Sequence, residues 1–225
     1  MVPDHITHLL IDKSVSTVRR RAFYEHPNIQ EVICHACVNK IGREAFSKCP
    51  NLRRVIMRGV KVIEEYAFNE CNTLSYIECG KLESIGERAF LECTSLERII
   101  LPLKNDMITV YTIFQRCNKL NHVDLVGGVH ETIAALPLEE WKNDMNKEID
   151  AINRILPRTP ATGLHGCVKK AMAIRKWMRK VHRKYTHYNA EHQRYLNLKA
   201  ALEPALPKDI VLKNIHPFLA KRCLY

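Results

Sequence analysis

The nine cysteines are the residues of this sequence whose types and spacing could carry metal or redox chemistry. Cys34 and Cys37 form a C-x-x-C pair, which is the spacing of half a zinc site or of a dithiol redox motif. A zinc site needs a second pair at a suitable distance, and a redox motif needs a surrounding βαβ pattern. The sequence contains neither, so we expect no metal and no cofactor at this pair.

Four other cysteines follow a fixed interval. They stand three residues after a phenylalanine and three before a leucine, at Cys49, Cys71, Cys93 and Cys117. In a stacked repeat such positions form a line with one thiol per coil, instead of converging on one point. Buried thiols of this kind behave as small hydrophobic side chains, so we expect them to pack in a core.

Enzyme motifs are missing from the sequence. The 11 histidines and 24 acidic residues fall in no nucleophile-elbow, zinc-protease or nucleotide-loop frame, and eight glycines disfavour phosphate cradles. We therefore nominate no catalytic residue, expect no small-molecule substrate and predict a non-enzymatic protein.

A repeat in the first half positions the cysteines. The repeated motif is Ile-Gly-x-x-Ala-Phe-x-x-Cys-x-x-Leu. It recurs with small changes, such as His26 in place of the cysteine in the earliest copy and Ile113 in place of the alanine in the last. Its five registers are marked by Phe23, Phe46, Phe68, Phe90 and Phe114. One such unit cannot offset a backbone ordering cost of about 1–2 kcal/mol per residue, so the units must stack.

A short alternating stretch after each leucine predicts a half-buried strand. The inward pairs are Leu9/Ile11, Val32/Cys34, Val55/Met57, Ile77/Cys79, Ile99/Leu101 and Val123/Leu125. The outward column is Leu10, Ile33, Ile56, Glu78, Ile100 and Asp124. Beside it runs the column His8, Glu31, Arg54, Tyr76, Arg98 and His122.

The unit closely resembles the BspA-like class of leucine-rich repeats over about residues 5–127. The resemblance implies a right-handed solenoid with a parallel sheet on its concave side, and protein binding in place of catalysis. The expected fold is therefore α/β, a leucine-rich-repeat solenoid followed by a C-terminal helical hairpin. Candidate partner contacts on the concave face are Ile33, Arg54, Ile56, Tyr76, Arg98 and Ile100. The alternative is that neighbouring strands or the C-terminal helices cover this column.

The second half has helical periodicity. One apolar face runs through Leu138, Trp141, Met145, Ile149, Ile152 and Leu156. We expect repeats over 1–128 in about five to six coils, a capping or linker segment over 129–137, and a basic tail over 138–225. The tail would hold helices at about 138–156, 167–203 and 208–219, the first two forming an antiparallel hairpin. The sequence of this tail resembles tails found with such repeats in large algal protein families. This resemblance implies no activity.

The formal net charge of +11 is concentrated in this tail, because residues 131–225 carry 18 basic and 9 acidic side chains. Candidate polyanion-binding residues are Lys169, Lys170, Arg175, Lys176, Arg179, Lys180, Arg183 and Lys184. No acidic residue lies between Ala151 and Ala190 to relieve their repulsion. The face is either simply solvated or met by an anionic partner: nucleic acid, an anionic membrane, an acidic protein, or a calmodulin-type groove gripping Trp177 and Val181.

Compartment and function follow from these patterns as expectations. No apolar run approaches the roughly 18 residues of a membrane helix, the N-terminus has no signal-peptide pattern, and the cysteine count is odd. We expect an intracellular protein, cytoplasmic or nuclear. The leading interpretation is a protein-interaction scaffold that binds through the concave face, and the alternative is an adaptor that binds a polyanion through residues 169–184.

Overall fold

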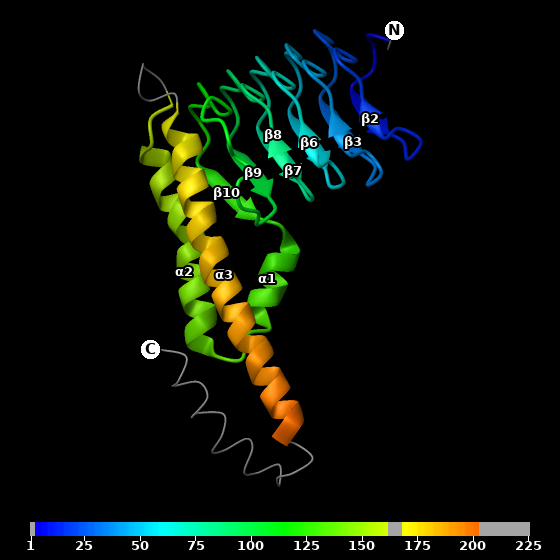
Figure 1. The fold of residues 1–225 in the computed structure, drawn as a ribbon. Helices are drawn as coiled ribbons and strands as arrows, with labels where there is room; N and C mark the ends of the chain where they lie inside the picture. Colours follow the sequence, from blue (N-terminus) through cyan, green and yellow to red (C-terminus); the bar gives the residue numbers. More distant parts are fainter. Residues whose placement is uncertain (1–2, 162–167, 203–225) are drawn as a thin grey trace.

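The computed structural model describes residues 3–161 and 168–202 as a parallel β-solenoid followed by helices (Figure 1). The predicted helix at 208–219 lies outside the described residues. In the described part, no helix is both long enough and apolar enough to cross a membrane.

Six four-residue strands form the larger sheet of the solenoid. They are β1 (His8–Ile11), β3 (Glu31–Cys34), β5 (Arg54–Met57), β7 (Tyr76–Cys79), β9 (Arg98–Leu101) and β10 (His122–Leu125). Their order in the sheet follows the chain, and every pair is parallel. The register aligns Leu10 with Ile33 and Ile33 with Ile56, so the two outward columns expected from the sequence are confirmed.

A second, smaller sheet was not anticipated. It contains the two-residue strands β2 (Thr17–Val18), β4 (Lys40–Ile41), β6 (Val62–Ile63) and β8 (Ser84–Ile85). Strands this short carry no readable alternation, which is why sequence patterning missed them. The Ile of the Ile-Gly motif supplies their buried residue, as at Ile41 and Ile85.

The repeated phenylalanines form one continuous stack through the coils. Neighbouring rings from Phe23 to Phe114 are nearly parallel, with centroids 4.9, 5.3, 5.5 and 5.6 Å apart. All but Phe23 are fully buried. The alanine before each ring is also fully buried at Ala45, Ala67 and Ala89, because a small side chain lets the coils approach.

The Ala-Phe segments are turns, and two residues in each complete turn have positive φ. Glu44 and Lys48, for example, flank Phe46 with φ of 57° and 62°. This geometry points alternate N–H groups at the next coil, where Phe46 N donates to Ala67 O at 2.8 Å and Lys48 N to Asn69 O at 2.7 Å. The turns therefore hold the stack by a third line of backbone hydrogen bonds.

Three α-helices follow β10: α1 (Gly127–Ala134), α2 (Glu139–Ile155) and α3 (Lys169–Leu202), with a 3-10 turn at Leu156–Arg158. Helix α1 lies in the segment expected to be a cap or linker, and it buries Val129 and Ile133 one turn apart. Helix α2 buries the expected face, including Trp141, Met145 and Ile152.

Helices α2 and α3 pair side by side beyond β10 (Figure 1). Ile174, Met178 and Val181 of α3 are buried, and Trp177 joins them at 5% exposure. The Trp177 indole N–H donates to the carbonyl of Glu148 on α2 at 2.9 Å. Trp177 and Val181 pack inside this helix pair, so neither side chain is accessible to the calmodulin-type groove named among the candidate partners.

The helices close the end of the solenoid at β10, the last strand of the sheet. The backbone N–H of Val123 in β10 donates to the side-chain oxygen of Asn153 on α2 at 2.8 Å. The ammonium of Lys170 donates to the carbonyls of Leu120, Asn118 and Leu156, the last two at 3.4 Å. Asn153 thus supplies an acceptor and Lys170 supplies donors in place of those of a further coil, so the sheet edge is covered.

Candidate functional site

The outer face of the six-stranded sheet, here called the sheet face, presents the two columns that alternate with the core. Its flanking column places Arg54 between Glu31, at 3.5 Å, and the ring of Tyr76, whose centroid is 5.0 Å from the guanidinium carbon. The Tyr76 hydroxyl donates to Glu78 at 3.3 Å. Burial and the neighbouring Glu78 carboxylate together raise the pKa of Tyr76.

Exposure of the central column falls along the solenoid from β1 to β5. Leu10 is 74% exposed, Ile33 37% and Ile56 only 8%. Ile100 is half-buried. Ile56 therefore offers almost no contact area, although the sequence nominated it together with Ile33 and Ile100. The apolar surface of the sheet face is concentrated at Leu10 and Ile33.

The sheet face near β10 is polar. Arg98 pairs with Asp124 on the neighbouring strand, and His122 lies 3.1 Å from the same carboxylate. Arg58 pairs with Glu78 at 2.9 Å nearer the centre. Of the nominated contacts, Arg54 and Arg98 are exposed and Tyr76 is half-buried. They stand together in one column, as the register requires.

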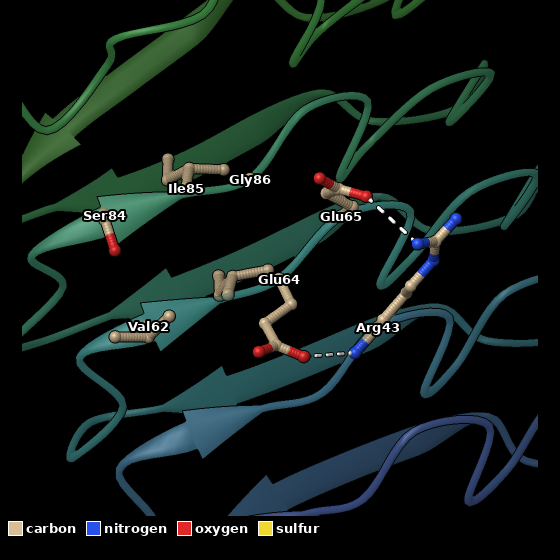
Figure 2. A pocket seen from close by; sticks show the side chains of 8 residues that line it. Arg43, Val62, Glu64, Glu65, Ser84, Ile85 and Gly86 are labelled. Atoms are coloured by element: carbon tan, nitrogen blue, oxygen red, sulfur yellow. Dashed lines mark hydrogen bonds and ion pairs between the residues drawn. The ribbon is translucent and has the colours of Figure 1, made fainter.

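A hollow of about 400 Å³ lies beside the smaller sheet, lined by Arg43, Glu64 and Gly86 among others (Figure 2). The backbone N–H of Arg43 donates to Glu64 at 2.8 Å, and its guanidinium lies 3.5 Å from Glu65. The charged groups of Arg43, Glu64 and Glu65 are thus paired between neighbouring coils. We interpret them as structural residues that stabilise the stacking of the coils.

The C-x-x-C pair and the cysteine column show no metal geometry. Cys34 is buried in the inward column, where burial raises its pKa to about 12, whereas Cys37 is exposed. Cys49, Cys71, Cys93 and Cys117 are buried free thiols. Within residues 3–161 and 168–202, no three His, Cys, Asp or Glu side chains group as a metal site would require.

The eight candidate cations of α3 divide into three groups. Lys170 is 2% exposed and caps the solenoid, so it offers no surface to a polyanion. Lys180 and Lys184 pair with Glu148 at 2.7 and 3.3 Å, and Lys184 also pairs with Asp144 at 2.8 Å. Tertiary packing thus brings acids from α2 that the local sequence lacks.

The third group faces away from α2. Arg179 and Arg175 approach the carboxylate of Asp106, in the loop after β9, at 2.6 and 3.8 Å. The side chains of Lys169, Lys176 and Arg183 make no hydrogen bond or ion pair with any residue that the structure describes. Sequence reasoning missed Asp106, because it lies about 70 positions away along the chain.

The geometry defines a class: a parallel β-solenoid whose coils repeat the Ala-Phe-x-x-Cys-x-x-Leu columns, closed at one end by a helix pair. The model of the BspA type leucine-rich repeat region matches residues 4–121 in six copies. The chain belongs to this family.

Several solved leucine-rich repeat structures are similar to this chain. A leucine rich cell surface protein from Faecalibacterium prausnitzii has 25% identity and a TM-score of 0.49, with 56% of this chain and 34% of that chain covered. A leucine-rich repeat protein from Eubacterium ventriosum has 20% identity, a TM-score of 0.49 and coverage of 53% and 33%. The T. pallidum leucine rich repeat protein has 19% identity, a TM-score of 0.40 and coverage of 59% and 84%.

The matched part of this chain spans about a third of the length of the first two of these structures. A search of curated proteins gave no match.

Proposed function

We propose that the protein is a non-enzymatic interaction scaffold whose protein partner binds the sheet face. The observation that carries this proposal is the exposed apolar pair Leu10 and Ile33, 74% and 37% exposed, beside a column of charged and aromatic side chains. Protein interfaces combine an apolar centre with a polar rim in this way.

Preorganisation of the flanking column supports the proposal. Arg54 is held by Glu31 on one side and by the Tyr76 ring on the other. Arginine and tyrosine are enriched among the residues that dominate binding energy. Because these side chains are already ordered by neighbours, a partner that contacts them loses less conformational entropy.

The accessibility of the sheet face also supports binding there. Helix α2 packs against β10, and the helix pair extends beyond that end of the solenoid (Figure 1). Leu10 and Ile33 belong to β1 and β3, at the other end of the sheet. A binding role fits the arginines of this face better than a catalytic one, since Arg54, Arg58 and Arg98 are engaged in ion pairs. The intracellular location stays a prediction.

Site-specific photo-crosslinking tests this proposal. A benzophenone amino acid placed at Ile33 should trap a defined partner in an extract of the source organism, and the same group at Glu65, beyond β6 on the coil, should not. The partner so identified should bind the Ile33→Asp variant about tenfold more weakly or worse, a loss of about 1.4 kcal/mol. Equal trapping at both positions, or unchanged affinity of the variant, would refute the sheet face as the binding surface.

A further inference from the structure

We propose that the outward side of α3 binds an acidic amphipathic helix of a protein partner, at a surface separate from the sheet face. The surface is the basic strip, defined as Arg175, Lys176, Arg179, Lys180 and Arg183, together with the exposed apolar groups of Met172 and Tyr111. The proposal rests on the charge left over within the fold, the shape beside α3 and the spacing of the side chains.

The charge of the basic strip is only partly compensated within the described residues. Glu148, itself 6% exposed, pairs with Lys180, and the exposed Asp106 serves both Arg175 and Arg179. Lys176 and Arg183 have no ion pair there. Five positive charges therefore face two carboxylates, which leaves about three in excess on one side of a single helix. Such a surplus attracts an anionic partner.

The surface beside α3 is hollowed along its length. One hollow of about 540 Å³ is floored by Tyr111, Met172 and Ala173, and a second of about 590 Å³ lies beside Asn105 and His182. Arg179 and Arg183 line both hollows, so the two adjoin along α3, and together they are called the groove here. From Met172 to Ala190 the groove follows α3 for about 27 Å at 1.5 Å per residue. That length matches about five turns of a partner helix.

Apolar side chains in the groove favour a protein over a phosphate polymer. Met172 is 47% exposed and Tyr111 37%. The guanidinium of Arg175 lies over the Tyr111 ring at 5.4 Å and donates to its hydroxyl at 2.6 Å, so one face of the ring is already occupied. Stacked bases would compete with Arg175 for this ring, whereas the apolar side of a helix packs on Met172 and the open ring edge.

The groove already binds a carboxylate. Asp106 lies between Arg175 and Arg179, and the arginine side chains lower its pKa, mainly through the hydrogen bond from Arg179. Met172, Lys176, Arg179 and Arg183 are spaced by four, three and four residues, which puts them on one side of α3. A partner helix with glutamates at the same spacing can pair with this row and place its leucines on Met172 and Tyr111.

Fluorescence anisotropy with the full chain tests the proposal. The probe is a labelled helical peptide of about 18 residues, five turns, with glutamates along one side and leucines beside them. Two comparison probes are a peptide of the same composition with the glutamates spread around the helix, and a single-stranded DNA of equal net charge. We expect the patterned peptide to bind at least about tenfold more tightly than either.

Two double variants of equal charge change locate the site. Lys176→Glu with Arg183→Glu should weaken patterned-peptide binding by about tenfold or more, whereas Lys13→Glu with Lys81→Glu, at exposed positions of the solenoid, should change it less than about twofold. Met172→Ser should weaken the peptide about threefold and leave DNA binding unchanged. Circular dichroism melting curves confirm that every variant is folded.

Three outcomes would overturn the inference. Equal binding of the spread-glutamate peptide would mean that only bulk charge is sensed. Tighter binding of the DNA would assign the strip to nucleic acid instead. Equal losses in the two double variants would show that the peptide binds elsewhere. Because Ile33 is not involved, none of these outcomes bears on the sheet face.

Discussion

The thiol of Cys71 donates a hydrogen bond to the carbonyl oxygen of Phe46 in the preceding coil, with Sγ and O 3.0 Å apart. The same bond joins Cys49 to Phe23, Cys93 to Phe68 and Cys117 to Phe90 at 3.0 to 3.1 Å. The cysteine column therefore fills the core and also satisfies one carbonyl in each coil. This second role explains why a weak donor recurs where an aliphatic side chain would fill the space.

Substitutions at Cys71 should separate the two roles. Cys71→Ala removes the donor and leaves a small cavity, and we expect a loss of about 1–3 kcal/mol in unfolding free energy. Cys71→Ser keeps a donor at nearly the same place and should cost less. Urea unfolding measures both. A serine variant less stable than the alanine variant would show that the hydrogen bond contributes little.

The phenylalanine stack should be most sensitive at its centre. Phe68 is fully buried between two rings, and Phe68→Ala should cost about 3–5 kcal/mol. Phe23 has one ring neighbour and is only partly buried, so Phe23→Ala should cost clearly less. Equal, small shifts of the urea midpoint in both variants would contradict a core stacked through all coils.

A single methyl group should have opposite effects at two glycines. A Cβ at Gly86 would lie 2.5 Å from the backbone nitrogen of Glu65 in the preceding coil, so Gly86→Ala must push the coils apart and lower the thermal midpoint. At Gly128 in α1 a Cβ meets nothing within 4 Å, and Gly128→Ala should stabilise by about 0.5–1 kcal/mol. A stable Gly86→Ala protein would mean that the coil spacing is adjustable.

Lys170 should be a structural cation. Lys170→Met leaves the carbonyls of Asn118, Leu120 and Leu156 without this donor, and we expect a loss of roughly 2–4 kcal/mol in unfolding free energy. Its exposed neighbour supplies the matched control, because Lys169→Met removes the same charge from the surface and should change stability by less than about 0.5 kcal/mol. Equal effects of the two changes would show that the end cap does not depend on this ammonium.

The α2–α3 contact should weaken in acid. Burial disfavours the Asp144 carboxylate, but hydrogen bonds from Lys184 and Tyr188 outweigh it and lower its pKa. A lowered folded-state pKa stabilises the fold above the unfolded value of about 3.9, and this contribution is lost as pH falls through the folded value.

Asp144→Asn should therefore cost about 0.5–1 kcal/mol at pH 7, a modest value because the side chain is 41% exposed, and almost nothing near pH 2. Asp150→Asn on the same helix, at an exposed position without an ion pair in the described residues, is the control. Denaturant unfolding at both pH values measures the difference. A loss that persists unchanged in acid would exclude the carboxylate as its cause.

The fold was largely predictable because residues at the same position of successive repeats also pack against one another in space. Once Phe46, Phe68 and Phe90 occupy equivalent places, in-register stacking fixes the strands, the inward pairs and the cysteine column. The short strands β2, β4, β6 and β8 escaped prediction because two residues carry no periodicity. Helix α1 escaped because its apolar residues, Val129 and Ile133, are few and follow two glycines.

By itself, the sequence determined which residues share a column, since that depends only on their spacing along the chain. The tertiary structure decided what each exposed position can offer. It buried Ile56 but left Ile33 exposed, withdrew Lys170 into the end cap and brought Asp106 to Arg179 from 73 positions away. These outcomes depend on the packing of distant segments, because burial and ion pairing are set by distance in space and not by distance along the chain.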